Sequence, residues 1–122
     1  MRDWTILIVD DNAAIRDLIR TVLDLHDEGR FVTVDADSAA TAVTAWQRTA
    51  PDAVVLDLRL GVDDGFEVAA RILAEQPDLP VVLYTAYLTD EIQNHAAELG
   101  VAACLTQDEL TRLPALLGDV LG

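Results

Sequence analysis

The stretch Ala53-Val54-Val55-Leu56-Asp57 carries four apolar residues, rich in valine, that lead directly into one carboxylate. A short apolar run bounded by turn residues is typical of a strand buried on both faces of a sheet. Glycine and aspartate follow in the segment 61–65, so the chain is expected to turn there. Asp57 would then stand where the strand leaves the core, and ligands of open α/β sheets bind at that edge.

Four further apolar runs predict strands, and each of the five is followed by a segment with helical spacing of its apolar residues. The predicted strands are Thr5–Val9, Phe31–Val34, Ala53–Asp57, Val81–Tyr84 and Val101–Leu105. The predicted helices run from Ala13 to about His26, from Ala39 to about Thr49, from Gly65 to about Gln76, from Asp90 to about Leu99, and from Thr106 or Asp108 to about Leu121. Asn12, Ser38 and Thr89 are suitable capping residues, and Pro114 indicates that the last helix has its first turn near Arg112.

This strict alternation predicts an α/β fold with a five-stranded parallel sheet. Helices would cover both faces of the sheet through right-handed crossovers. The 122 residues suit one domain, 1–122. Apolar residues make up 52% of the chain, which is enough for a core and excludes a disordered chain.

The formal charge is −14, from 22 acidic residues against eight bases, and every base is arginine. Such a surface repels nucleic acid and anionic membranes, so no direct binding to either is expected. Two interpretations of the acids stay open. They form a solvated face that aids solubility, or some of them cluster to bind a cation.

Cysteine usage and hydropathy bear on the cellular compartment. The one cysteine, Cys104, excludes an internal disulfide and favours a reducing cytoplasm. No apolar run approaches the roughly 18–20 residues of a membrane span, and the start of the chain lacks the pattern of a signal peptide. We therefore expect a cytoplasmic location.

Polar side chains follow three of the predicted strands. Asp10 and Asp11 come after the first strand, Asp57 ends the third, and Thr85 follows the fourth. If the first and third strands are neighbours, three carboxylates converge, and their mutual repulsion costs free energy unless a cation lies between them. Carboxylates, a backbone carbonyl and water suit Mg²⁺.

This set of residues resembles the receiver domain of two-component response regulators. The resemblance rests on Asp10-Asp11, Asp57, Asp64-Gly65 and Thr85-Ala86, each at the end of the right strand or the start of the right helix, and it covers essentially the whole chain. It implies a flavodoxin-like (βα)5 three-layer sandwich with strand order 2-1-3-4-5.

The resemblance also implies a role for each site residue. Asp57 would be the phosphoacceptor, a carboxylate nucleophile that takes a phosphoryl group from a phosphohistidine as an acyl phosphate. Asp10, Asp11, Asp57 and the backbone carbonyl of Arg59 would hold Mg²⁺. Thr85 would hydrogen-bond a phosphoryl oxygen and report phosphorylation by turning inward. The domain would be no enzyme beyond its own phosphorylation and dephosphorylation.

The implied partners are a histidine kinase or a histidine phosphotransfer protein. An effector or a second copy of the chain would bind the face made by the fourth helix, the fifth strand and the last helix. The alternative is a receiver-like interaction module that works without phosphorylation. A third hypothesis, an enzyme on a similar sheet, is disfavoured. Arg59 stands where a dehalogenase-type phosphatase needs a second aspartate, and Asp10-Asp11-Asn12 lacks the phosphate-binding glycines of a nucleotide binder.

The chain departs from the family pattern at several positions. Gln107 stands where most receivers have a lysine, and Cys104 occupies the position of an aromatic switch residue. Gly61 replaces a common proline, and Asp63 adds an acid, so we expect a looser and more negative loop after Asp57. The two tyrosines, Tyr84 and Tyr87, are both expected to be packing or rim residues. Tyr87 is at a position where the family varies the side chain and tunes the lifetime of the phosphoryl group.

Overall fold

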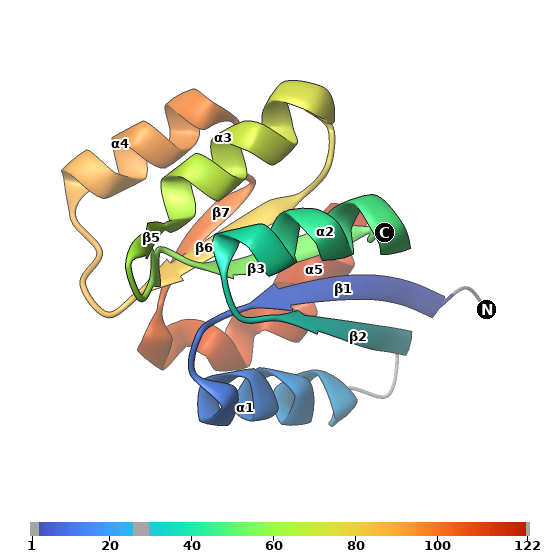
Figure 1. Cartoon of the computed structure of the whole chain (residues 1–122). Coiled ribbons are helices and arrows are strands. Elements are labelled where there is room, and N and C mark those ends of the chain that lie inside the picture. Colours follow the sequence, from blue (N-terminus) through green and yellow to red (C-terminus); the bar gives the residue numbers. More distant parts are fainter. Residues whose placement is uncertain (1–2, 26–29, 122) are drawn as a thin grey trace.

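Five strands pair in parallel in the order β2-β1-β3-β6-β7 (Figure 1). The computed structural model describes residues 3–25 and 30–121. The sheet contains β1 (Asp3–Val9), β2 (Arg30–Ala36), β3 (Ala53–Asp57), β6 (Val81–Thr85) and β7 (Ala103–Thr106). The helices are α1 (Ala13–Asp24), α2 (Ala39–Thr49), α3 (Gly65–Glu75), α4 (Asp90–Leu99) and α5 (Leu113–Leu121), with a 3₁₀ helix, η1 (Gln107–Arg112), before α5. The predicted α/β class and strand order 2-1-3-4-5 are confirmed.

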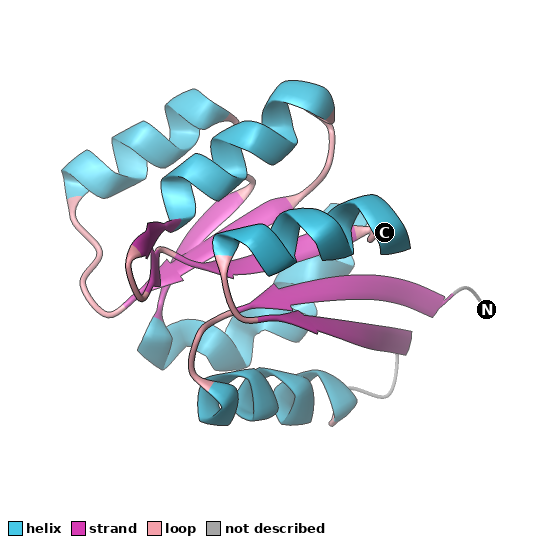
Figure 2. Cartoon of the chain, in the orientation of Figure 1, coloured by secondary structure: helices cyan, strands magenta, loops and turns pink. Residues whose placement is uncertain are grey.

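Period-two alternation along the strands divides the core into two layers. In β3, Val54 and Leu56 face one side of the sheet and Val55 faces the other. Helices α2, α3 and α4 cover the first side, and α1 and α5 cover the second (Figure 2). Continuous apolar runs such as β3 are required because both faces of the sheet are buried. No helix in the described ranges has the length and apolar character needed to cross a bilayer.

Several helix ends follow the predicted capping residues. Ser38 caps α2 by accepting a hydrogen bond from the Thr41 N–H, and α2 has the predicted bounds. Thr89 caps α4 through its hydroxyl, and Gly100 closes that helix with a φ of +90°. Helix α1 ends at Asp24, earlier than predicted. The predicted end at His26 lies outside the described residues.

The connection into the last helix differs from the prediction. Strand β7 begins at Ala103 and extends to Thr106, which caps the 3₁₀ helix η1 rather than an α-helix. The α-helical geometry begins only at Leu113, because Pro114 has no N–H and fits the first turn of a helix. Leu113 and Leu117 are fully buried against the sheet, so packing accounts for most of the apolar face of α5.

The loop after Asp57 is more ordered than its sequence predicts. It forms a small antiparallel pair, β4 (Arg59–Leu60) with β5 (Asp63–Asp64). Gly61 has a φ of +64° at the turn, a conformation closed to the proline of the family pattern. The Asp63 carboxylate accepts a hydrogen bond of 3.0 Å from the Ala39 N–H at the start of α2. The prediction of a looser loop is therefore wrong, since Asp63 ties this loop to a helix N-terminus.

Gly65 lets helix α3 start directly against the end of β3. Its N–H donates to the Leu58 carbonyl at 2.8 Å. A Cβ at this position would lie 2.4 Å from the Asp57 carbonyl oxygen and 2.8 Å from the Leu58 Cα. Both are backbone atoms, so no side-chain rotation could relieve the contact.

We expect Gly65→Ala to destabilise the protein by about 1–3 kcal/mol, because the methyl group forces the backbone apart next to Asp57. The matched control is Gly118→Ala in α5, where an added Cβ meets nothing within 4 Å. That variant should gain about 0.5–1 kcal/mol from the higher helix propensity of alanine. Urea unfolding measures both changes, and equal midpoints for the two variants would contradict this account.

Candidate functional site

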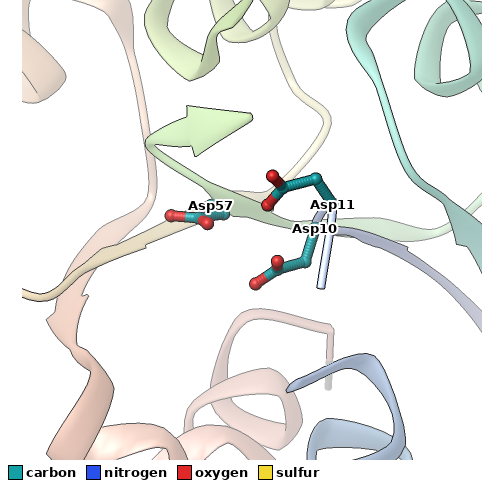
Figure 3. A group of neighbouring side chains, drawn as sticks. All are labelled: Asp10, Asp11 and Asp57. Atoms are coloured by element: carbon teal, nitrogen blue, oxygen red, sulfur yellow. The ribbon is translucent and has the colours of Figure 1, made fainter. Parts of the chain in front are cut away.

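Three carboxylates meet at the carboxyl edge of the sheet (Figure 3). Strands β1 and β3 pair with Val9 opposite Leu56, so the next residues, Asp10 and Asp57, are level with each other. Asp11 comes from the same β1–α1 connection as Asp10. Each of the three residues offers one carboxylate oxygen, and these oxygens all lie within 4.8 Å of one another. The predicted convergence of Asp10, Asp11 and Asp57 is thus observed.

Burial and like charge perturb the central carboxylate. Asp57 is 9% exposed and Asp10 is 1% exposed, whereas Asp11 is exposed. The pKa of Asp57 is raised to about 6, mainly by burial and also by the charges of Asp10 and Asp11, and a 3.1 Å hydrogen bond from the Arg59 N–H opposes the rise. A carboxylate pair held this close favours a bound cation.

Asp10 is held by donors on both of its carboxylate oxygens. The Asn12 N–H donates to Oδ1 at 2.8 Å, and the Tyr84 hydroxyl donates to Oδ2 at 2.5 Å. Burial raises the pKa of Asp10, and these two hydrogen bonds lower it. Arg16 also reaches this residue, but its Nη1 donates to the main-chain carbonyl of Asp10 at 2.6 Å.

Tyr84 is the site residue that sequence reasoning missed. It was expected to be a packing or rim residue, and its ring is indeed buried. Its hydroxyl, however, reaches the acidic cluster, and burial together with the hydrogen bond to Asp10 raises the pKa of the phenol. The missed signal was alternation: Asp57 and Tyr84 are paired in β3 and β6, so their side chains leave the same face of the sheet.

A cavity of about 470 Å³ adjoins Asp57, and Thr85, Tyr87 and Gln107 contribute to its lining. Thr85 is 6% exposed, and its hydroxyl accepts a hydrogen bond of 3.4 Å from the Tyr87 N–H. Gln107 is exposed at the start of η1, and among the described residues its side chain makes no hydrogen bond. The structure brings Thr85 and Gln107 to the same cavity as Asp57.

The donor set fits a hard divalent cation. All of its side-chain donors are carboxylate oxygens, and the exposed Asp11 leaves the cluster open to solvent for water ligands. The cluster is an acidic metal-binding triad. The carbonyl of Arg59 as a further ligand stays a prediction; the N–H of this residue binds Asp57.

The fold and this acidic edge define a flavodoxin-like α/β domain with a cation-binding site beside a buried carboxylate. The family model for the response regulator receiver domain matches residues 6–116. The chain belongs to this family, and it is a receiver domain of two-component signalling.

Two similar proteins differ in how much of their own length this chain covers. The chain is 42% identical over 134 residues to the alginate biosynthesis transcriptional regulatory protein AlgB of Pseudomonas syringae pv. tomato, covering 94% of this chain and 29% of that protein. It is 38% identical over 114 residues to an uncharacterized 14.6 kDa protein of Leptolyngbya boryana, covering 88% of this chain and 85% of that protein. The chain therefore spans less than a third of the AlgB relative and most of the other.

Solved structures share the fold. A two-component response regulator of the LuxR family from Aurantimonas sp. SI85-9A1 superimposes with a TM-score of 0.88 at 23% identity, covering 98% of this chain and 86% of that one. The BeF3-activated DrrB receiver domain superimposes with a TM-score of 0.82 at 26% identity, covering 98% of both chains.

We expect Asp57→Asn to stabilise the metal-free protein at pH 7.5 by an amount on the order of 3 kcal/mol. The pKa of Asp57 is raised to about 6 in the folded protein, so the wild type loses stability as the pH rises from about 4 through 6. The variant carries no such charge, and the difference should disappear near pH 4. Urea unfolding in EDTA across this range measures it.

The control for this prediction is Asp11→Asn, which removes an exposed carboxylate from the same cluster. It should stabilise the metal-free protein less than Asp57→Asn does, because an exposed charge keeps most of its hydration. Identical unfolding curves for wild type and Asp57→Asn from pH 4 to pH 7.5 would contradict the argument.

Proposed function

We propose that residues 1–122 act as a phosphoacceptor switch in which Asp57 receives a phosphoryl group from a phosphohistidine. The donor is a histidine kinase or a histidine phosphotransfer protein. The observation that carries the proposal is the meeting of three carboxylates within 4.8 Å beside a cavity that also contains Thr85. A single cysteine favours a reducing cytoplasm as the place of action.

In the proposed step, an oxygen of the Asp57 carboxylate attacks the phosphorus of the phosphohistidine. The new O–P bond forms as the N–P bond breaks, and the imidazole nitrogen keeps the electron pair of the broken bond. The hydrogen bond from the Arg59 N–H to Oδ1 orients the nucleophile, leaving the other oxygen to react. Thr85, in the adjoining cavity, would donate its hydroxyl to a phosphoryl oxygen.

Mg²⁺ is the cation that we propose for the acidic triad. Asp10, Asp11, Asp57 and the Arg59 carbonyl would hold it, together with water. Bound there, it would neutralise charge on the transferring phosphoryl group. The exposed position of Asp11 leaves room for an incoming phosphoryl group at the mouth of the cluster.

The output would pass through the face made by α4, β7 and α5, to an effector or to a second copy of the chain. Thr85 ends β6 and pairs with Thr106 of β7, so an inward turn of Thr85 acts next to this face. Cys104 lies half-buried on β7 beside a cavity of about 240 Å³ lined by α4 residues. A thiol cannot swing as an aromatic ring does, so the movement would be carried by the backbone of β6 and β7.

The alternative is a receiver-like interaction module that signals without phosphorylation. Gln107 favours it, because an exposed neutral amide stands in the cavity where the family pattern has a cation. A hydrogen bond to a charged group contributes roughly 1.5–3 kcal/mol, and the neutral amide forfeits part of that together with the Coulomb attraction.

We expect incubation with acetyl phosphate and Mg²⁺ to add one phosphoryl group to the wild type and none to Asp57→Asn. Intact-mass spectrometry measures the adduct directly. A second arm measures binding of beryllofluoride with and without Mg²⁺. No adduct, together with no Mg²⁺-dependent beryllofluoride binding, would overturn the proposal in favour of the phosphorylation-independent module.

We expect Gln107→Lys to lengthen the lifetime of the acyl phosphate, because an ammonium group in this cavity attracts the phosphoryl oxygens. The decay of the phosphorylated mass after removal of the phosphodonor measures the lifetime. Gln107→Met, of similar length but without a donor, is the matched control. A lifetime in Gln107→Lys equal to that of the wild type would count against this role of position 107.

A further inference from the structure

Asp10, Asp57 and Tyr84 form a row across three neighbouring strands. Val9 pairs with Leu56 and Asp57 pairs with Tyr84, so the three residues are level at the carboxyl edge of β1, β3 and β6. Alternation puts their side chains on the face of the sheet that α1 and α5 cover, where Ile8, Val55 and Val82 also point. The Tyr84 side chain starts on β6 and its hydroxyl reaches Asp10 beyond the end of β1, so it spans the β3 position between them.

The hydrogen bond from Tyr84 to Asp10 is buried and short. Tyr84 is 0% exposed, Asp10 is 1% exposed, and the oxygens are 2.5 Å apart. A hydrogen bond with a charged acceptor in a dry environment is stronger than a neutral one, and the fixed ring leaves the hydroxyl little freedom to move. Among the described residues, every buried side-chain polar atom has a hydrogen-bond partner. The contact between Tyr84 and Asp10 is one of these hydrogen bonds, and it satisfies both buried oxygens.

In the described part of the chain, no arginine donates a hydrogen bond to the Asp10 carboxylate as Tyr84 does. The guanidinium of Arg16 pairs with the Asp35 carboxylate and with the main-chain carbonyl of Asp10. The ion pairs of Arg16, Arg20, His95 and Arg112 have Asp17, Asp35, Glu98 and Glu109 as acidic partners, and none of these acids belongs to the cluster. Arg59 lines the cavity with an exposed side chain.

We propose that Tyr84 is a positioning residue of the phosphoryl-transfer site. Its hydroxyl holds the Asp10 carboxylate in position, a role that a cationic side chain would otherwise have. Tyr84 fixes Oδ2 of Asp10 and the Asn12 N–H fixes Oδ1, so the Asp10 carboxylate keeps one orientation beside Asp57. The ring excludes water from the floor of the site. This inference rests on the proposed role of Asp57.

The test is a double-mutant cycle of Tyr84→Phe and Gln107→Lys. Tyr84→Phe removes only the hydroxyl, and a lysine at 107 brings a cation into the cavity that contains Asp57. With saturating Mg²⁺ and acetyl phosphate, Tyr84→Phe should slow phosphorylation about tenfold. Gln107→Lys should then raise the rate of Tyr84→Phe about threefold more than it raises that of the wild type, because the two donors serve one cluster.

A second readout needs no phosphorylation. In EDTA, Tyr84→Phe should lower the Tm by about 3–8 °C, and Gln107→Lys should restore more of the Tm in this background than it adds to the wild type. The control is Trp46→Phe, which removes a buried donor in the other core layer, where Trp46 Nε1 donates to Gln76 at 3.0 Å. That variant should lose stability, phosphorylate at the wild-type rate and gain nothing specific from Gln107→Lys.

Strictly additive effects in both cycles, with a wild-type phosphorylation rate for Tyr84→Phe, would overturn the inference and make Tyr84 a packing residue. If Tyr84→Phe alone does not fold, recovery of the folded protein by Gln107→Lys supports the inference, and failure to recover it refutes the inference. If the wild type takes no phosphoryl group, the proposed function falls, and the unfolding cycle still decides whether Tyr84 and a cation at 107 serve the same carboxylate.

Discussion

Mutual repulsion of three carboxylates at the end of an apolar sheet is the constraint around which this domain is arranged. Two of them, Asp10 and Asp57, are buried, and parallel strands deliver both to one level. Charges this close are stable only where donors or a cation compensate them. The surrounding polar contacts supply those donors: the main-chain N–H groups of Asn12 and Arg59 and the hydroxyl of Tyr84. The site is thus built to be completed by a positive charge.

The same constraint explains the order of the loop that follows Asp57. The small β4–β5 pair, the left-handed Gly61 and the glycine at the start of α3 bring the chain back within reach of the acids. Asp63 turns its charge away from the cluster and onto the N-terminus of α2, where peptide dipoles favour an anion. An added acid therefore stiffens this loop, and it does so without joining the cluster.

The fold was predictable because its signals are local and repeated. Five apolar runs, Pro and Gly boundaries and capping residues such as Ser38 and Thr89 mark the elements, and their alternation leaves few topologies. The acids were predictable because each ends a strand. The role of Tyr84 was not predicted, because it depends on strand order, register and the facing side of two strands at once. The β4–β5 pair was missed because two-residue strands leave no periodic pattern.

Cys104 offers a chemical probe of the face made by α4, β7 and α5. It is the one thiol in the chain, it lies half-buried on β7 beside α4, and burial raises its pKa. A neutral, shielded thiol reacts slowly with alkylating reagents, and its reactivity rises as the surroundings open. The rate at which the natural protein is alkylated would therefore report any separation of β7 from α4, without a reporter group introduced by mutation.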